Sequence, residues 1–394
     1  MKILFLSRWF PFPANNGSKL RIYNLLRGLN QVHDVTLLSF ADQPNVSPEA
    51  PELQSICKDV HIVPWREFDP NRWRARLAFF SLKPRSVVDT FSEEMAQKIT
   101  ALLKAQKFDL IIASQFPMAA YFPYFGNVPA LFEELELGLS YGDAHDPKGG
   151  WKKRLRHTLT WFKLRRYFSQ LLDVFQACTV VSEKECQLLQ QIFPAHKKDL
   201  LVLPNCVNVK GYENIHVEPK PNQLVFTGSF RYHTNYEAML WFVRDVFPMV
   251  LEKVPQAQLV ITGDNAGLAF PSSPNVALAG YVDDIASLIA SSTVSLAPLW
   301  SGGGTRLKIL EAMAIGTPVV ATSKGAEGLD IISGEHLFVA DDPRQFAEHV
   351  IRLLGENGLR EKISSNARNF VGANYDWEKV MPKLFRLLEQ ISRN

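Results

Sequence analysis

The sequence predicts an α/β protein with two domains, each built on a parallel sheet covered by helices. With 394 residues the chain is too long for one ordinary hydrophobic core, and its 46% of apolar residues suffices for two. Short apolar runs rich in β-branched residues alternate with amphipathic stretches throughout. Strands that are apolar on both faces are typical of parallel sheets, because helices cover both sides of such sheets.

The first domain is expected over residues 1–207. Its first helix is predicted at residues 18–29, after the apolar run KILFLS. Its strands are predicted at residues 2–7, 34–40, 108–114 and 178–182. An interdomain linker is placed at residues 208–222, because PNCVNVKGYENIHVEPKPNQ holds three prolines and no apolar periodicity.

The second domain is expected over residues 223–375, where the same alternation restarts. A helix is predicted around residues 236–254. Strands are predicted at residues 223–229, 258–264, 275–280, 294–299, 318–323 and 336–340. The tail, residues 376–394, is predicted to form an amphipathic helix that is interrupted at Pro382.

The composition argues against several classes of protein. A net charge of +3 is far below that of a dedicated nucleic-acid binder, so no nucleic-acid partner is expected. The four cysteines form no CxxC pair, which argues against a disulfide framework or zinc site and favours the cytoplasm. The opening MKILFLSRWF has an apolar run of only four residues, and we expect neither a signal peptide nor a spanning helix.

The segment SGGGTRLKILEAMAIG, which starts at Ser301, begins with three glycines. Gly302, Gly303 and Gly304 stand between a predicted strand and a predicted helix, where open α/β sheets bind their ligands. The backbone N–H groups of such a loop, through Thr305, and the positive end of the following helix suit a phosphate.

Two cations and one carboxylate follow the glycines. Arg306 and Lys308 supply full positive charges for a diphosphate, and Glu311 suits the hydroxyl groups of a ribose. This order matches the phosphates and then the sugar of a nucleotide. Glycines alone would favour a flexible turn followed by solvated side chains. The full string favours the nucleotide site.

The same segment resembles the donor site of the family-four retaining glycosyltransferases of the GT-B fold, the glycosyl transferases group 1. Their C-terminal domains carry a glycine-rich loop, then LEAMA, then G-x-P-V-V-A-T, as here. SRWFPFPANNGSKLRIYNLLRGL, FTGSF and LAGYVDDI continue the resemblance over nearly the whole chain. It implies two Rossmann-like domains facing each other across a cleft, with the C-terminal helix returning to the N-terminal domain.

The resemblance also implies a function. We expect transfer of a sugar from a nucleotide diphosphate sugar to a glycan or lipid-linked hydroxyl acceptor, with retained anomeric configuration, in cell-surface polysaccharide or glycolipid assembly. Arg306 and Lys308 are the expected catalytic residues, and neither a cofactor nor a metal is expected. The N-terminal domain would supply the acceptor pocket. The expected substrate contacts are Gly17, Gly228, Ser229, Tyr281, Val282, Gly302, Gly303, Gly304, Thr305 and Glu311.

The sequence departs from the family pattern at several positions. The first of two family glutamates falls on Gly303, so only Glu311 remains. The family's Arg and Lys fall near Ser229 and Asn235, and we expect the two cations of the glycine-rich segment to replace them. Gln115 stands where many relatives place a histidine near the reacting sugar.

Other functions stay open. An epimerase of the same fold would release a nucleotide without an acceptor, and a phosphorylase would need a lysine for pyridoxal phosphate, which nothing here singles out. A non-catalytic nucleotide-sugar binding protein would have lost activity together with the missing family residues. Nucleotide release that depends on an acceptor distinguishes the transferase from these alternatives.

Residues 151–168, WKKRLRHTLTWFKLRRYF, are basic and aromatic with no acidic residue. One interpretation is a helix that lies on an anionic membrane surface, which would place the protein on the inner face of the membrane. The equally weighted alternative is a helix that packs its apolar residues inward and leaves its charges solvated. Those residues are Leu155, Leu159, Phe162 and Tyr167.

Glu133, Glu134 and Glu136 form an acidic cluster. A glycosidase would need paired carboxylates, but consecutive positions point apart, so a solvated or interdomain role is favoured. Whether one of these glutamates faces the acceptor stays open. Other candidates for the acceptor side are Asp143, His145 and Asp146.

Overall fold

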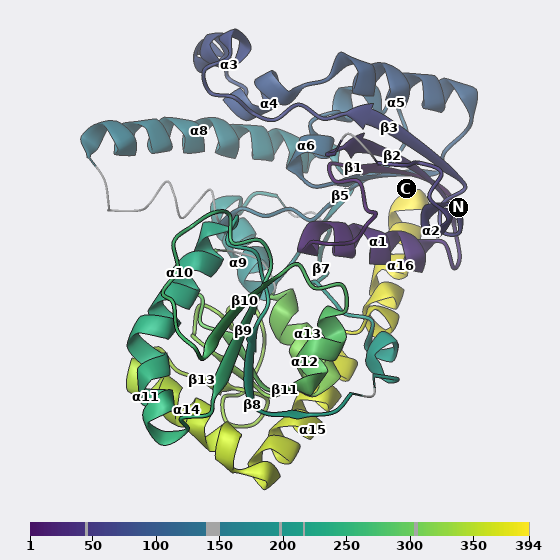
Figure 1. Ribbon diagram of the computed structural model, residues 1–394. Coiled ribbons are helices and arrows are strands. Elements are labelled where there is room, and N and C mark those ends of the chain that lie inside the picture. The colour runs from purple at the N-terminus through teal and green to yellow at the C-terminus, as the bar shows by residue number, and fades with distance from the viewer. Residues whose placement is uncertain (44–45, 139–149, 197–198, 216, 303–305, 394) are drawn as a thin grey trace. The chain divides into compact units, whose positions relative to one another are not determined.

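The computed structural model describes residues 1–43, 46–138, 150–196, 199–215, 217–302 and 306–393. The chain divides into two compact units. Unit 1 comprises Met1–Pro204 and Met381–Asn394, and unit 2 comprises Asn205–Val380. Figure 1 labels their helices and strands. No helix among the described residues combines the length and hydrophobicity that crossing a bilayer requires.

Unit 1 contains a parallel sheet. Seven strands of its described part lie in the order β3-β2-β1-β4-β5-β6-β7, and each pairing is parallel. The order reverses between β1 and β4, which is the switch point of a doubly wound sheet. The strands are β1 Lys2–Ser7, β2 Asp34–Ala41, β3 Asp59–Pro64, β4 Leu110–Ser114, β5 Ala130–Glu133, β6 Ala177–Val180 and β7 Asp199–Val202.

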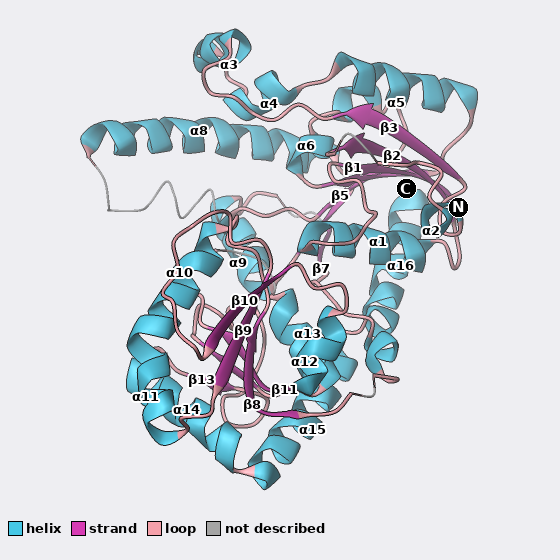
Figure 2. Cartoon of the chain, in the orientation of Figure 1, coloured by secondary structure: helices cyan, strands magenta, loops and turns pink. Residues whose placement is uncertain are grey.

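Helices flank the sheet of unit 1, drawn in cyan around the magenta strands in Figure 2. Asn16, Ser92 and Ser182 begin α1, α5 and α9, because each side chain accepts a hydrogen bond from a backbone N–H of the first turn. The helices are α1 Gly17–Leu29, α2 Pro51–Gln54, α3 Trp73–Leu77, η1 Ala78–Phe80, α4 Arg85–Thr90, α5 Glu93–Ala105, α6 Phe116–Ala119, η2 Phe122–Tyr124, α8 Trp151–Val174 and α9 Glu183–Ile192.

The last helix, α16 (Trp377–Arg393), joins unit 1 from Met381 onward. It packs so closely on α1 that a Cβ atom at Gly28 would lie 2.7 Å from the Met381 Cε. The ring of Phe385 meets that of His33 edge to face, with 5.6 Å between the centroids. The predicted return of the C-terminal helix to the N-terminal domain is confirmed.

The predicted interruption of this helix at Pro382 is wrong. α16 continues through the proline. Proline removes one backbone hydrogen bond, but Met381, Leu384 and Leu388 are buried along the same helix. Packing of this apolar face therefore outweighs the lost donor, as tertiary contacts often outweigh local propensity.

Unit 2 repeats the architecture. Within its described residues, six strands form a parallel sheet in the order β10-β9-β8-β11-β12-β13, with the reversal between β8 and β11. The strands are β8 Lys220–Phe226, β9 Gln258–Thr262, β10 Val276–Gly280, β11 Ser292–Ala297, β12 Val319–Ala321 and β13 Phe338–Val339. Both sheets thus have the doubly wound order that the alternation of the sequence predicts.

The helix predicted around residues 236–254 consists of three parts, α10, the π-helical turn η4 and α11. Residues 208–222, expected as a linker, contain a helical turn, η3, and the first residues of β8. The helices of unit 2 are η3 Val209–Tyr212, α10 His233–Trp241, η4 Phe242–Val246, α11 Phe247–Lys253, α12 Ile285–Ser291, α13 Leu307–Ile315, α14 Pro343–Gly355 and α15 Asn357–Asn374.

Candidate functional site

The glycine-rich segment lies at the carboxyl edge of the second sheet. β8 and β11 are parallel neighbours, so the loops that follow them leave the sheet at the same edge. Gly228 and Ser229 follow β8, whereas Gly302 and Arg306 follow β11 and lead into α13. This edge, at the point where the strand order reverses, is where doubly wound sheets bind ligands. The expected contacts Gly303, Gly304 and Thr305 lie outside the described residues.

Gly302 and Arg306 hold each other in place. Gly302 has a φ of 96°, which favours glycine, and a Cβ atom there would lie 2.7 Å from the Tyr232 hydroxyl oxygen. The Arg306 Nη2 donates a hydrogen bond to the Gly302 carbonyl oxygen at 2.8 Å. Arg306 is only 7% exposed. It therefore fastens the loop at the start of α13 and is not a solvated surface charge.

Lys308 places an ammonium group beside the loop that follows β8. Its Nζ lies 3.1 Å from the Asn235 Oδ1 and 3.9 Å from the centroid of the Phe226 ring. A Cβ atom at Gly228 would lie 3.2 Å from the same Nζ. Burial, and then the positive charge of Arg306, lower the pKa of Lys308 to about 7.

Asn235 connects Lys308 to the loop after β8. Its Nδ2 donates to the Ser229 carbonyl oxygen at 2.9 Å, while its Oδ1 accepts from Lys308. Gly228 has a φ of 144°, and a Cβ atom there would lie 2.7 Å from the Asn235 Nδ2. The ammonium group thus occupies the neighbourhood of Asn235, where the family pattern would place a different cation.

Glu311 is held by a tyrosine that the sequence analysis missed. The Tyr212 hydroxyl hydrogen-bonds to the Glu311 carboxylate. Burial raises the pKa of Glu311 to about 7, opposed by the charge of Lys308 and by this hydrogen bond. Glu311 is therefore not an ordinary exposed helix residue. Tyr212 lies in η3, within the segment expected as a linker, and its aromatic ring in a polar stretch was the only sequence signal.

The remaining expected contacts occupy simpler positions. Tyr281 and Val282 follow β10, so they leave the sheet of unit 2 at the same edge as the glycine-rich segment, and Tyr281 is 76% exposed. Gly17 is exposed at the first position of α1 in unit 1. Their contacts with a donor stay predictions.

In unit 1, Glu133 is not solvated, which corrects the favoured interpretation of the acidic cluster. It is 1% exposed and accepts a hydrogen bond from the Arg21 Nε at 2.8 Å. The Ser114 hydroxyl donates to its other oxygen at 2.6 Å. Arg21, itself 1% exposed, requires a buried carboxylate, so Glu133 is the counter-charge of a core arginine.

Glu134 and Gln115 form a second pair at the ends of β5 and β4. The Gln115 Nε2 donates to the Glu134 Oε2 at 2.7 Å. Both residues have positive φ, 60° for Glu134 and 70° for Gln115, which is uncommon outside glycine. Burial raises the pKa of Glu134 to about 7, while the nearby charge of Arg21 acts in the opposite direction. The other acceptor-side candidates, Asp143, His145 and Asp146, lie outside the described residues.

A small cavity of about 150 Å³ lies in unit 1 beside the residues that follow β3 and β4. Aromatic side chains dominate its lining: Trp65, Phe68, Phe91, Phe116 and Tyr121. Aromatic faces suit sugar rings or hydrocarbon equally. Elsewhere in the described residues, no three His, Cys, Asp or Glu side chains are grouped as metal ligands would be.

A family model described as Glycosyl transferases group 1 matches residues 221–356. This segment therefore resembles a glycosyl transferases group 1 domain. It covers the sheet of unit 2, the glycine-rich segment and the Lys308 and Glu311 side chains. The resemblance drawn from the sequence is confirmed, and the matched segment contains Gly228, Arg306, Lys308 and Glu311 of the candidate site.

Two relatives extend the comparison. An uncharacterized 44.6 kDa protein in the cps region of Klebsiella pneumoniae is 24% identical over 407 residues, which cover 98% of this chain and 99% of that protein. A phosphatidyl-myo-inositol mannosyltransferase of Mycobacterium tuberculosis is 30% identical over 211 residues. That match covers 49% of this chain and 55% of the mannosyltransferase, so it spans about half of each protein.

The fold is also similar to a solved structure over the whole chain. The crystal structure of Alr3699/HepE from Anabaena in complex with UDP and glucose has a TM-score of 0.64 and 15% identity. The likeness covers 99% of this chain and 100% of the other. At that identity it shows the fold alone, and the predicted GT-B fold is confirmed.

Proposed function

We propose that this glycosyltransferase moves a sugar from a nucleoside diphosphate sugar to a hydroxyl acceptor, with retained configuration, in the assembly of a cell-surface polysaccharide or glycolipid. The observation that carries the proposal is the geometry of α13. Arg306 at its N-cap and Lys308 and Glu311 in its first turns follow the order in which a nucleotide presents diphosphate and ribose. The relative in a cps region and the neighbour crystallised with UDP support the same assignment.

The residues have distinct roles in this reaction. Negative charge grows on the diphosphate as the bond to the sugar breaks, and a fixed cation that faces it lowers the barrier. Lys308 supplies that charge. Arg306 adds to it while its guanidinium group donates to the Gly302 carbonyl oxygen. Glu311 accepts hydrogen bonds from the ribose hydroxyls. Because these cations neutralise the negative charge of the leaving diphosphate, the proposed reaction requires no metal ion.

The acceptor side is assigned to unit 1. Its aromatic cavity and the Glu134–Gln115 pair both adjoin the carboxyl ends of strands, where α/β sheets bind ligands. Gly17 is placed against the diphosphate by analogy with the family. A glycan or lipid-linked acceptor fits this side.

Nucleotide release tests the function. A thermal-shift screen first selects the base, because a nucleoside diphosphate at 100 times its Kd adds about 2.7 kcal/mol to the free energy of unfolding. The matching nucleotide sugar is then incubated with EDTA, with and without a lipid and glycan extract. We expect release of the nucleoside diphosphate only with the extract, and little release by Lys308→Ala.

Other outcomes would assign other functions. Release without the extract indicates an epimerase or a hydrolase. Binding of the nucleotide sugar without release under any condition indicates a non-catalytic binding protein. Activity that EDTA abolishes and Mg²⁺ or Mn²⁺ restores contradicts the proposed role of the two cations.

A further inference from the structure

We propose that unit 1 docks on an anionic lipid bilayer through one continuous surface formed by α3, η1 and the segment that follows them, together with α8. We call residues 72–85 and 151–166 the docking surface. Neither segment contributes to the candidate donor site, which lies in unit 2. The inference therefore goes beyond the proposed transfer reaction and concerns where that reaction takes place.

The first half of the docking surface exposes large apolar side chains. Within ten consecutive residues, five such side chains are more than half exposed: Trp73, Leu77, Phe79, Phe80 and Leu82. Phe80 is 88% exposed. A water-facing loop rarely gathers so many aromatic and aliphatic side chains, because each costs free energy in water. Such a group indicates a surface that an apolar partner covers.

The second half is α8, and its exposure contradicts inward packing. Leu155, Leu159 and Phe162 are 53%, 42% and 62% exposed, whereas only Tyr167 of the four residues expected inward is buried. With Trp151, the three exposed residues recur at the spacing of one helix face. α8 therefore exposes an apolar stripe. Inward packing of the apolar residues with solvated charges, the alternative considered from the sequence, does not account for this exposure.

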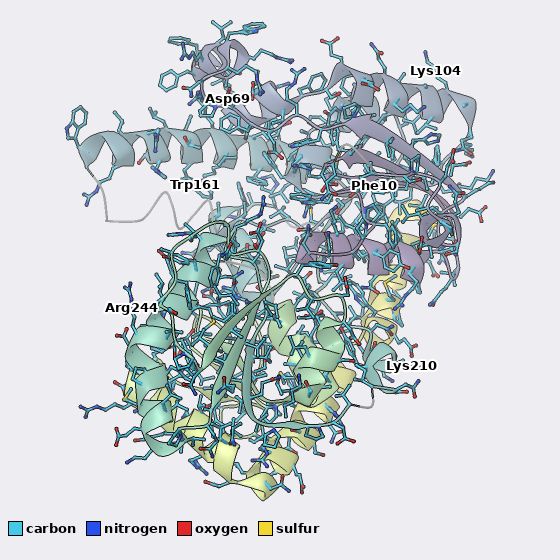
Figure 3. The ribbon with its side chains drawn as sticks, in the orientation of Figure 1. Phe10, Asp69, Lys104, Trp161, Lys210 and Arg244 are labelled. Carbon is cyan, nitrogen blue, oxygen red and sulfur yellow. The ribbon has the colours of Figure 1, made fainter. Side chains whose placement is uncertain are left out.

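Lys163 joins the two halves. Its Nζ donates to the carbonyl oxygens of Ala78 and Phe79 in η1, and it lies 5.4 Å from the centroid of the Phe79 ring. Figure 1 shows α3 alongside α8, and Figure 3 shows their side chains, with Trp161 of α8 labelled. Burial, and then the charge of Arg85, lower the pKa of Lys163. The two exposed apolar groups thus belong to one surface.

The positive charge of the two segments indicates which kind of partner would bind the docking surface. Residues 72–85 contain five Lys and Arg, residues 151–166 contain seven, and neither has an Asp or Glu. The whole chain has a net charge of only +3, so the remainder carries −9. Apolar side chains surrounded by cations fit the hydrocarbon and anionic headgroups of a bilayer. A second copy of the chain would bring cations against cations, which disfavours self-association through this surface.

Sedimentation with vesicles tests the proposal on the full-length protein. Wild-type protein is mixed with phosphatidylglycerol vesicles or with phosphatidylcholine vesicles at about 0.1 M and 1 M salt, between which the screening length falls from about 10 to 3 Å. We expect binding to phosphatidylglycerol that weakens at high salt, and much weaker binding to phosphatidylcholine.

Two variants at exposed residues measure separately how apolar contact and positive charge contribute to vesicle binding. The apolar variant is Trp73→Ser, Phe80→Ser, Leu82→Ser. The charge variant is Arg76→Glu, Lys83→Glu, Arg156→Glu. We expect the apolar variant to bind both vesicles about tenfold or more weakly, because it loses hydrocarbon contact. The charge variant loses the preference for phosphatidylglycerol.

Controls make changes of the same kind, apolar to Ser or Lys to Glu, elsewhere on the surface. They are Val32→Ser with Ile332→Ser, and Lys58→Glu, Lys104→Glu with Lys107→Glu, all at exposed positions. Lys104 of α5 is labelled in Figure 3. These controls should bind as the wild type does. Each protein must keep the wild-type thermal transition, which shows that a loss of binding is not a loss of folding.

Three outcomes would overturn the proposal. Wild-type protein that binds neither vesicle at low salt excludes the bilayer as partner. Docking variants that bind as well as the controls place the contact elsewhere. A wild-type dimer in sedimentation equilibrium that the apolar variant dissociates assigns the surface to a second copy. Vesicle binding needs no nucleotide sugar, so it can succeed where the transfer assay fails.

Discussion

The Tyr212 hydroxyl and the Glu311 carboxylate are joined by a hydrogen bond inside unit 2. The bond ties η3, which follows the first unit in sequence, to α13, which carries the two candidate cations. It also stabilises the charged form of a carboxylate whose pKa burial raises to about 7. Tyr212 is thus positioned to keep Glu311 ionised for a ribose.

Tyr212→Phe should weaken nucleotide binding by about 10-fold and by at most about 100-fold, the range of a hydrogen bond to a charged group. Without the hydroxyl the pKa of Glu311 rises further, so less carboxylate is available at pH 7. The donor KM should rise while kcat at saturating donor holds, because the ribose contact is the same in the ground and transition states. Tyr375→Phe removes a hydroxyl from the same apolar cluster and serves as the control. Equal effects of both variants would contradict a specific role of Tyr212.

Arg306→Ala and Lys308→Ala should each lower kcat about tenfold to a hundredfold, as loss of a charge-assisted contact with the leaving group predicts. Lys308→Arg should retain more activity than Lys308→Ala, because it keeps the charge. Arg244→Ala, at an exposed position of η4, is the control for loss of an arginine. Full activity in either alanine variant would remove that residue from the site. Steady-state rates with the donor identified by thermal shift provide the measurement.

The doubly wound sheets could be predicted because a parallel strand is buried on both faces, and such strands have a distinctive sequence. β1 contains Ile3, Leu4, Phe5 and Leu6, all with no exposed surface. The loop before α13 could be placed because glycine, cation and carboxylate follow one another in the sequence. The order of residues along short stretches of the sequence was therefore sufficient to predict the sheets and this loop.

Contacts between distant segments could not be predicted in this way. Tyr212 reaches Glu311, and Arg21 reaches Glu133, only after the sheets have formed, and no spacing in the sequence encodes either pair. The apolar residues of α8 have helical spacing, which fits an inward or an outward face equally well. Only the structure shows that its Leu155 and Phe162 are exposed.

Nucleotide affinity should fall as the pH rises through about 7. Burial and the charge of Arg306 lower the pKa of Lys308 to about 7, so above this pH the free protein holds a neutral amine. A diphosphate favours the charged ammonium, and binding at pH 8 should therefore take up a proton. Calorimetry in two buffers of different ionisation enthalpy measures that uptake. Lys308→Arg stays charged and should abolish it.

Glu311 contributes to the proton balance with the opposite sign. Its pKa is also about 7, and the ribose favours the carboxylate, so binding below pH 7 should release a proton. Glu311→Gln should remove this release, and because the charge of Glu311 raises the pKa of Lys308, it should also move the proton uptake by Lys308 to lower pH. Proton exchange of wild-type size in both Lys308→Arg and Glu311→Gln would show that neither group titrates with the nucleotide.

Glu133→Gln should destabilise unit 1 by about 3 to 5 kcal/mol, because the buried charge of Arg21 loses its closest carboxylate and keeps only the longer contact with Glu134. The Arg21 Nη2 also donates to the Leu203 carbonyl oxygen at 2.9 Å, but a neutral acceptor does not compensate a full charge. Glu134→Gln is the matched control, since its carboxylate lies 3.8 Å from the Arg21 Nε, and it should cost less than half as much. Urea unfolding measures the free energies.

A double variant separates a missing counter-charge from a damaged fold. Arg21→Met in the Glu133→Gln background removes the buried charge whose counter-charge at Glu133 the single variant neutralises, and the methionine fills much of the same volume. The free energy of unfolding should therefore recover most of what Glu133→Gln loses, because a buried pair as a whole contributes far less than breaking it costs. If the double variant is less stable than Glu133→Gln, the hydrogen bond from Arg21 to Leu203, and not the ion pair, is what the core requires.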